Sequence, residues 1–320
     1  MHTSNDHPHE PRLLMITPVR NEASFIGPMI DSVVGQAFQP AKWLIIDDGS
    51  SDCTPDIVAR HAITSPFIEL LRLPRREERQ AGGEGAIAHA LKLCHVEDFE
   101  YVGRFDGDLI LGRDYIAGIL KEFDQDPQLG IAGGGLYIYK KDRLELERAP
   151  EYHVRGAVKM YRRQCLECIG GLSPGIGWDT IDEVYAWLNG WKTKSFFQYK
   201  VIHSRPTGSC LCTRDIYRER GKAEYLTWSH PMFVLAKTVK LFRDELSLVA
   251  SVSFLMGFVN CYFTRKPRIT DSRFVAARRG QQLRRIALSF ISRGQSLHRS
   301  YDFASRLQSE PPAPAALPQP

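Results

Sequence analysis

The chain has 320 residues, of which 43% are hydrophobic, and its formal net charge is +5 at pH 7. This length predicts one large domain or a catalytic domain with an appendage, and the composition is that of a globular protein with a sizeable core. The seven cysteines follow no disulfide framework, and residues 1–11 lack the apolar core of a signal peptide. We therefore expect a reducing, cytoplasmic location and a disordered leader over residues 1–11.

Strands and helices alternate through about the first 125 residues. Compact apolar runs predict strands at Arg12–Pro18, Lys42–Ile46, Ile68–Leu73 and from Tyr101 onwards. Helical spacing predicts helices at Ser24–Val34, from Thr54 as the N-cap with Pro55 in its first turn, and at Ala86–His95. This alternation predicts an α/β fold with a mainly parallel central sheet flanked by helices.

Polar clusters follow three of these strands: PVRNE (18–22), DDGSSD (47–52) and DGD (106–108). Because ligands bind at the carboxyl ends of parallel strands, we expect the clusters to converge on one site. Asp106 and Asp108 can hold a divalent cation that completes its shell with substrate phosphates. A capped turn is the alternative for each cluster, and for DGD that turn would simply be acidic. The chain lacks GxGxxG after the first strand and lacks GxxxxGK[ST], which argues against a dinucleotide enzyme or P-loop hydrolase.

Together, TPVRNE, DDGSSDCT and DGD resemble the motifs of a family 2 glycosyltransferase with the GT-A fold, over roughly residues 13–209. MYRRQCLECIGGL (160–172) and GWDTIDEV (177–184) continue the resemblance into the acceptor region. The resemblance implies a GT-A type, Rossmann-like domain over residues 12–209. Its nucleotide-binding part would cover residues 12–110 and its acceptor part residues 111–209.

The resemblance also implies roles for individual residues. The nucleotide-sugar site would use Thr17, Pro18, Arg20, Glu22, Asp48, Arg79, Asp106 and Gly107. The metal, Mn²⁺ or Mg²⁺, would be held by Asp108, Asp106 and His203. Arg205 and Arg104 are further candidates for phosphate contacts.

The general base is expected within GWDTIDEV. Alignment on Gly190 places Asp179 on the family's catalytic Asp, while Asp182 and Glu183 follow within one turn and compete for the role. Trp178 stands where the family has Glu, and its indole could stack on an acceptor sugar. The Gln-x-x-Arg-Trp signature of processive synthases is missing from this region, which favours addition of one sugar per encounter.

Residues 210–300 are predicted to form a helical, basic, membrane-associated extension, followed by a disordered tail at 301–320. Between Ala236 and Ser300 there are thirteen Lys/Arg and three acids. Pro231–Phe242 predicts an amphipathic helix, and Leu246–Phe263 carries no charge over eighteen residues. A membrane span, an interfacial helix and a buried core helix are alternatives for that run. The adjacent Arg265, Lys266 and Arg268 favour attachment to a membrane surface over nucleic-acid binding.

The expected function is inverting, metal-dependent transfer of a sugar from a UDP- or GDP-sugar to a glycan or polyprenyl-linked acceptor. The expected setting is exopolysaccharide or capsule synthesis, with the protein peripheral or monotopic at the inner face of the cell membrane. Two alternatives stay open: a sugar nucleotidyltransferase, and a catalytically silent binding protein with the same fold.

Overall fold

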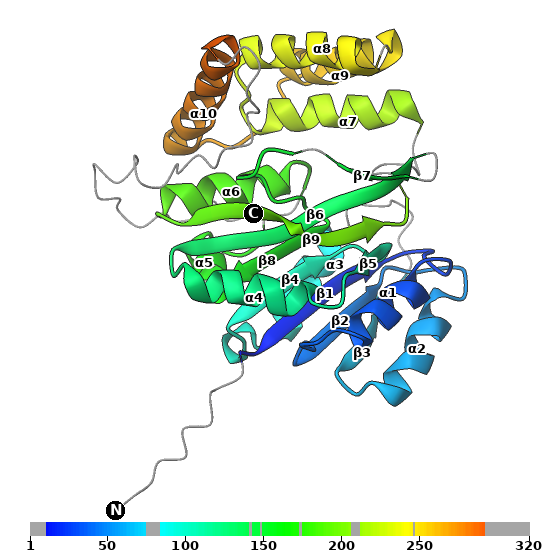
Figure 1. The fold of residues 1–320 in the computed structure, drawn as a ribbon. Helices are drawn as coiled ribbons and strands as arrows, with labels where there is room; N and C mark the ends of the chain where they lie inside the picture. Colours follow the sequence, from blue (N-terminus) through cyan, green and yellow to red (C-terminus); the bar gives the residue numbers. More distant parts are fainter. Residues whose placement is uncertain are drawn as a thin grey trace, which may run out of the picture.

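The structure is a computed structural model that describes residues 11–74, 84–140, 143–147, 149–172, 175–205, 212–245 and 247–291. Residues 1–10, the 301–320 tail and Arg79 lie outside the described residues. The boundary predicted at residues 209–210 also falls outside them, so it stays a prediction. Figure 1 shows a central sheet flanked by helices, with the C-terminal helices gathered at one end.

Four parallel strands form the first half of the sheet, in the order β3-β2-β1-β4. They are β1 (Leu13–Val19), β2 (Lys42–Asp47), β3 (Ile68–Arg72) and β4 (Tyr101–Phe105). The first two and the fourth are buried almost throughout, as expected for parallel strands covered on both faces. These positions agree with the strands predicted from the apolar runs.

The second half of the sheet is mixed rather than parallel. Its strands are β5 (Leu109–Leu111), β6 (Leu129–Lys140), β7 (Arg143–Leu146), β8 (Val158–Arg162) and β9 (Lys192–His203). They continue the order as β4-β8-β6-β9-β5, with β7 beside β6. Among the described pairings of these five strands, the β6–β9 pair is parallel and the others are antiparallel. The expectation of a mainly parallel sheet is therefore correct only for the nucleotide-binding half.

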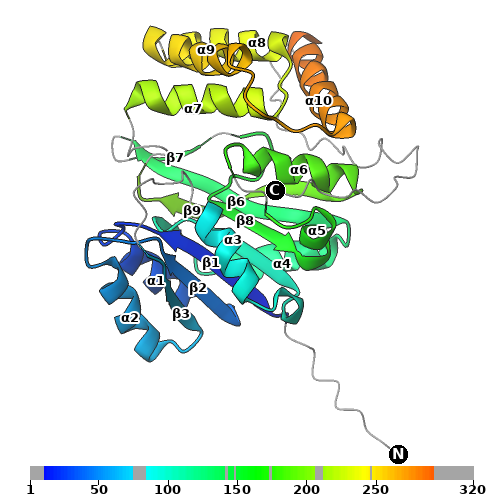
Figure 2. The ribbon, with the colours of Figure 1, turned by 180° about the vertical axis from the view of Figure 1, so that it is seen from behind.

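Helices cover both faces of the sheet (Figures 1 and 2). One face packs against α1 (Ile26–Val34), α2 (Thr54–Thr64) and α4 (Tyr115–Gln125). The other packs against α3 (Glu84–Leu93), α5 (Arg163–Cys168) and α6 (Trp178–Leu188). A 3-10 turn, Val96–Asp98, leads into β4. The two apolar clusters fix the sheet from both sides and so hold its carboxyl edge in place.

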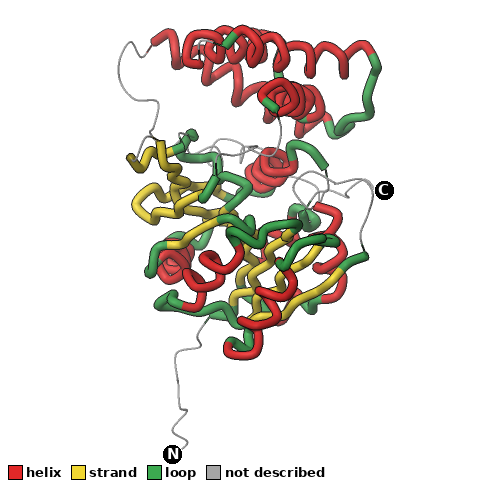
Figure 3. Tube along the Cα trace, turned by 90° about the vertical axis from the view of Figure 1, so that its right-hand side faces the viewer, coloured by secondary structure: helices red, strands yellow, loops and turns green. Residues whose placement is uncertain are grey.

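The described part of the C-terminal region forms four helices: α7 (Thr213–Leu226), α8 (Pro231–Glu245), α9 (Leu248–Phe263) and α10 (Ser272–Ile291). The last of them returns to the sheet domain, where Phe274 packs on Tyr185 of α6 with ring centroids 5.3 Å apart. In Figure 3 the group stands clear of the strands. Within the described ranges, no helix combines the length and apolar character needed to cross a membrane.

Candidate active site

The loops after β1 and β2 are held together by hydrogen bonds around Asn21. This residue has a positive φ of 56°, a conformation that Asn tolerates better than most residues. Its side-chain oxygen accepts from Ser51 N at 2.8 Å, and its backbone N–H donates to Ser50 Oγ at 2.9 Å. Thr54 is the first residue of α2 rather than its N-cap, and its hydroxyl accepts from Glu22 N at 2.8 Å. The PVRNE loop (18–22) and the DDGSSD loop (47–52) are thus joined by hydrogen bonds into one surface, named the wall here.

The predicted nucleoside residues lie along this wall in different environments. Thr17 is fully buried and its hydroxyl accepts from the Trp43 indole N–H at 3.0 Å. Pro18 is the next residue of β1, which ends at Val19. Asp48 is buried, and its carboxylate lies 3.9 Å from Arg20 Nη1. Gly107 fits closely under the wall, because a Cβ there would lie 2.8 Å from Val19 Cγ1.

Asp108 and His203 come together where β5 pairs with β9. The register places Leu109 opposite His203, and the His203 Nε2 atom lies 3.3 Å from Asp108 Oδ1. Arg205 Nε donates to Asp108 Oδ2 at 2.6 Å. Burial acts to raise the pKa of Asp108, but the hydrogen bond from His203 and the charge of Arg205 outweigh it and lower this pKa. Asp108 is therefore ionised at neutral pH.

Arg205 is the central cation of this group. Besides Asp108, its guanidinium hydrogen-bonds the carboxylate of Glu22, and it lies over the ring of Phe25 at 4.9 Å. It therefore joins the PVRNE loop to the DGD loop. From the sequence Arg205 was only one of several candidate phosphate contacts, because nothing in RPTG indicates which carboxylates it meets.

The donor atoms around Asp108 fit a hard divalent cation. A carboxylate oxygen and an imidazole nitrogen are both ligands that Mn²⁺ accepts, and Mg²⁺ also prefers oxygen ligands and substrate phosphates. His203 Nδ1 is buried and has no hydrogen-bond partner among the described residues. No set of three or more His, Cys, Asp or Glu side chains is arranged for a metal in the described part of the chain. Asp108 and His203 thus offer two donor groups, and substrate oxygens would have to complete the shell of any metal held there.

Asp106 pairs with Arg104, whereas Asp108 pairs with His203 and Arg205. The Asp106 side chain is 37% exposed, and Arg104 Nη1 lies 3.3 Å from its Oδ1 atom. The same guanidinium lies over the Trp178 ring, with 4.2 Å to the centroid, and hydrogen-bonds the carbonyl of Gly156. Arg104 therefore links the DGD loop directly to the first turn of α6, where the predicted base lies.

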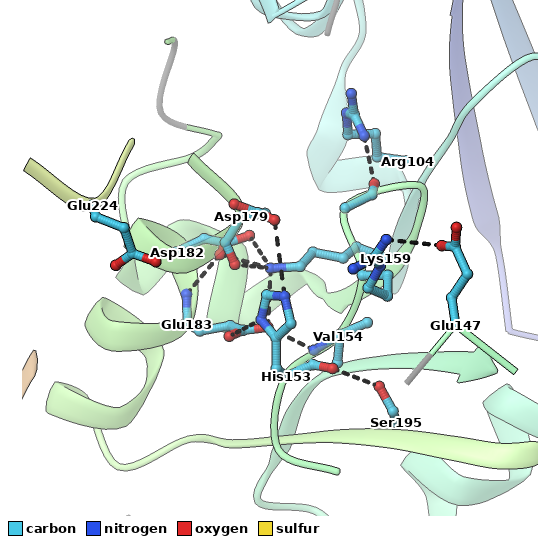
Figure 4. Close-up of polar contacts among 12 residues, drawn as sticks. Arg104, Glu147, His153, Val154, Lys159, Asp179, Asp182, Glu183, Ser195 and Glu224 are labelled. Carbon is cyan, nitrogen blue, oxygen red and sulfur yellow. Dashed lines mark hydrogen bonds and ion pairs between the residues drawn. The ribbon is translucent and has the colours of Figure 1, made fainter. Parts of the chain in front are cut away.

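Two of the three acids on α6 are buried in an ion-pair network (Figure 4). Lys159 of β8 is fully buried, and its Nζ lies 2.8 Å from Asp182 Oδ1 and 3.2 Å from Glu183 Oε1. Tyr161 also hydrogen-bonds Asp182. Burial lowers the pKa of Lys159, but the two carboxylates outweigh it and raise that pKa, so the ammonium stays charged. This burial closes Asp182 and Glu183 to an acceptor.

Asp179, in the first turn of α6, is the acid with an accessible side chain. It is 35% exposed, and His153 Nε2 lies 4.0 Å from its Oδ2 atom. The other ring nitrogen of His153 lies 2.9 Å from Glu183 Oε2. Figure 4 marks this contact with a dashed line. Burial raises the pKa of Asp179, but the positive charges of His153, Lys159, Arg155 and Arg104 lower it overall. An ionised, accessible carboxylate at a helix N-terminus can accept a proton.

The structure corrects the expectation for Trp178. Its indole is only 7% exposed, and the Arg104 guanidinium covers one face of the ring. A sugar needs an open aromatic face to stack on, so the indole supports Arg104 and the start of α6 instead of an acceptor.

Sequence reasoning missed Lys159 and His153. A Lys between Val158 and Met160 inside an apolar strand was the available signal for a buried cation. Because His153 lies thirty residues before Glu183 in an irregular segment, the sequence carries no comparable signal for their contact.

The profile of glycosyl transferase family 2 matches residues 15–221, which is well over half of the chain. Among curated proteins, the poly-beta-1,6-N-acetyl-D-glucosamine synthase of Staphylococcus aureus is 27% identical over 124 residues. That match covers 39% of this chain and 28% of the synthase, so the compared region is about a quarter of the relative's length.

Two solved structures share the fold. A mannosyltransferase from Pyrobaculum calidifontis, PcManGT in complex with GDP-Man and Mn²⁺, superposes with a TM-score of 0.52 at 18% identity. The match covers 94% of this chain and 79% of that one. GalNAc-T7 with UDP, GalNAc and Mn²⁺ gives a TM-score of 0.53 at 12% identity, over 82% and 60% of the two chains.

Proposed function

Because the chain belongs to glycosyl transferase family 2 and is a glycosyltransferase, we propose that it moves one sugar from a nucleoside-diphosphate donor to an acceptor hydroxyl with inversion. The main observation behind this proposal is a series of contacts and sequence neighbours that leads from Arg205 and Asp108 to Asp179. Arg104 connects the two ends, since it contacts both Asp106 and the Trp178 ring. A donor site and a base that are joined by contacting residues can hold the two reacting groups in line.

The donor end would stabilise the leaving diphosphate. Negative charge accumulates there as the glycosidic bond breaks, so cationic groups near the phosphates lower the barrier. Arg205 supplies one such charge, while Glu22 and Asp48 offer acceptors to the N–H groups of a nucleobase. Asp108 and His203 would hold Mn²⁺ or Mg²⁺, which adds further positive charge to the diphosphate. Two fold neighbours are solved with nucleotides or nucleotide sugars and Mn²⁺, which supports this proposal.

The acceptor end would use Asp179 as general base. The acceptor oxygen attacks the anomeric carbon while the bond to the diphosphate breaks, and the hydroxyl proton passes to the Asp179 carboxylate. The lowered pKa of Asp179 keeps it ionised before the reaction. Lys159 donates to the Asp179 carbonyl at 2.5 Å and so fixes the first turn of α6.

The proposed acceptor is a glycan or a lipid-linked glycan in polysaccharide synthesis. The similarity to a poly-beta-1,6-N-acetyl-D-glucosamine synthase supports this class of product. Membership of glycosyl transferase family 2 argues against the alternative of a sugar nucleotidyltransferase. A catalytically silent protein would keep the fold and the donor site without turnover, so the experiment has to separate binding from transfer.

Calorimetry with UDP-, GDP- and TDP-sugars, with and without Mn²⁺, tests the donor site. We expect one nucleotide class to bind, more tightly with the metal, and Asp108→Ala to remove the metal dependence. Asp124→Ala, an exposed acid on α4, is the matched control and should bind like the wild type. If no sugar nucleotide binds under either condition, the proposed function is wrong.

A turnover assay separates the base from the donor site. Asp179→Asn should bind the donor normally and lose transfer to an acceptor. Normal transfer by this variant would exclude Asp179 as the base. Donor binding by the wild type with no transfer to any hydroxyl acceptor or water would favour the silent protein.

A further inference from the structure

The surface of α9 is reversed relative to a helix of a water-soluble protein. Its side toward α7 and α8 carries mostly small residues: Ala250, Ser251, Ser253, Gly257 and Cys261 are buried, together with Phe254. Its outward side carries large apolar residues: Leu248, Val249, Val252, Met256, Val259 and Phe263 are 37–79% exposed. Soluble helices place large apolar side chains inward, so this exposed stripe requires an explanation.

Close packing between α7 and α9 explains why the small residues face inward. A Cβ at Gly257 would lie 2.1 Å from the Arg218 carbonyl oxygen, and one at Gly221 would lie 1.9 Å from the Phe254 carbonyl oxygen. The two backbones therefore approach more closely than larger side chains would permit. This crossing uses the small residues of α9, and the six large apolar side chains named above are left on the outside.

The neighbouring helix α8 carries a second exposed apolar stripe. Met232, Leu235, Val239 and Phe242 recur at spacings of three and four and are 50–68% exposed. In Figures 1 and 2, α8 and α9 lie together at the end of the molecule remote from α1 and α2, with α7 between them and the sheet. Isolated exposed apolar residues are common, but two adjacent stripes of this length mark an interaction surface.

Basic residues lie at the C-terminal ends of both stripes. Lys240 and Arg243 are exposed in the last turns of α8, and Arg265 and Lys266 are exposed directly after α9. Tyr262, 59% exposed, adjoins this second pair. An apolar face bordered by Lys, Arg and an aromatic ring matches the boundary between acyl chains and anionic headgroups. A second copy of the chain would instead bring these like charges toward one another.

We propose that the apolar stripes of α8 and α9, named here the α8–α9 surface, lie in the headgroup region of an anionic membrane. The stripes enter the acyl boundary, while Lys240, Arg243, Arg265 and Lys266 contact lipid phosphates. This attachment needs no catalysis, so it stands independently of the proposed sugar transfer. It places the sheet domain on the aqueous side of the surface.

Vesicle flotation of the full chain tests the proposal, with phosphatidylcholine alone and phosphatidylcholine mixed with phosphatidylglycerol. We expect binding to the mixed vesicles and weaker binding to the neutral ones. The double variant Val252→Glu/Met256→Glu should bind the mixed vesicles at least about tenfold more weakly, since it removes two apolar contacts. Ile63→Glu is the matched control: Ile63 is 83% exposed on α2, away from the surface, and its change should leave binding unaltered.

A charge variant tests the lipid headgroup part of the proposal. Lys240→Glu/Arg265→Glu should lose most of the preference for phosphatidylglycerol, while Lys121→Glu, an exposed change on α4, should retain it. Thermal unfolding and donor binding should match the wild type in every variant, which separates this result from the proposed function. The proposal is wrong if the wild type binds neither kind of vesicle, or if Val252→Glu/Met256→Glu floats like the wild type. If the wild type does not float but forms a dimer that Val252→Glu/Met256→Glu dissociates, the surface binds a second copy instead.

Discussion

At the residue scale, the three acids of α6 differ in what surrounds them rather than in their chemistry. Asp179 is 35% exposed and lies in the first helical turn, whereas Asp182 and Glu183 are buried against Lys159. A buried carboxylate that already accepts from an ammonium contributes to folding more than to proton transfer. The environments therefore predict different consequences for the same substitution.

We expect Asp179→Asn to lower turnover by about 10²- to 10⁴-fold, the usual contribution of a general base, with little change in stability. Asp182→Asn should instead destabilise the fold by about 3–5 kcal/mol, because it leaves the buried Lys159 charge poorly compensated. Steady-state kinetics and urea unfolding of both variants measure the two effects. Equal losses of stability in the two variants would contradict the division of roles.

Lys159 offers a second test of the same network. Lys159→Met leaves Asp182 and Glu183 buried without their cation and should destabilise the protein by about 3–5 kcal/mol. A triple variant that also carries Asp182→Leu and Glu183→Gln should recover part of this loss, since fewer charges remain buried. Urea unfolding of the two variants measures the recovery. No recovery would mean that packing, rather than charge, makes Lys159 important.

Some of these residues could be predicted from the sequence and others could not. Asp108, His203 and Asp179 were predicted from motif order, and the structure places Asp108 beside His203 at 3.3 Å. Their roles stay predictions. The pairing of Lys159 with Asp182 escaped prediction, because its partners are separated by twenty-three residues and belong to a strand and a helix. Burial, which decides between acids of equal chemistry, is a property of tertiary packing rather than of local sequence.

At the scale of the elements, the length of the apolar runs and the hydrophobic period between them predicted the first half of the sheet well. Apolar runs bounded by turn residues specify β1, β2 and β4 locally, and each is buried as such a run requires. The mixed second half was not predicted, because strand direction depends on which distant strand becomes the neighbour. β8, for example, pairs antiparallel with both β4 and β6.

The crossing of α7 and α9 could not be predicted from the apolar run either, since an uncharged run does not indicate which side of the helix packs inward.

We expect Gly257→Ala to cost about 1–3 kcal/mol, because the new methyl would overlap the Arg218 carbonyl and push the helices apart. Gly280→Ala is the matched control, as a Cβ at Gly280 meets nothing within 4 Å on α10. It should stabilise the helix by about 0.5–1 kcal/mol. Equal effects of the two changes on urea unfolding would contradict the close crossing.

At the scale of the whole molecule, one buried carboxylate joins the C-terminal helices. Glu224 of α7 pairs with Lys237 of α8 and lies 3.6 Å from Arg278 of α10, and it hydrogen-bonds Ser229. Because α10 also packs on α6 through Phe274, this group ties the α8–α9 surface to the catalytic half. The proposed membrane attachment and the proposed active site thus belong to one folded unit.

The charge state of Glu224 makes the stability of this unit depend on pH. Burial raises the pKa of Glu224, but Lys237 and Arg278 outweigh it and lower the pKa to about 2. A lowered folded-state pKa contributes stability above the unfolded-state value of 4.5, and that stability is lost as the pH falls toward about 2. The full contribution is on the order of 3 kcal/mol, from 1.36 kcal/mol per pKa unit.

We therefore expect the unfolding free energy of the wild type to fall more steeply between pH 5 and pH 2 than that of Glu224→Gln, whose side chain cannot titrate. At neutral pH the variant should be less stable, and the difference should narrow as acid protonates Glu224 in the wild type. Glu219→Gln is the control on the same helix: Glu219 is 39% exposed and lies 3.5 Å from Lys222, so its screened pair should change stability by less than about 1 kcal/mol. Urea unfolding across this pH range measures all three proteins. Parallel curves for the wild type and Glu224→Gln would show that the helices are held by packing alone.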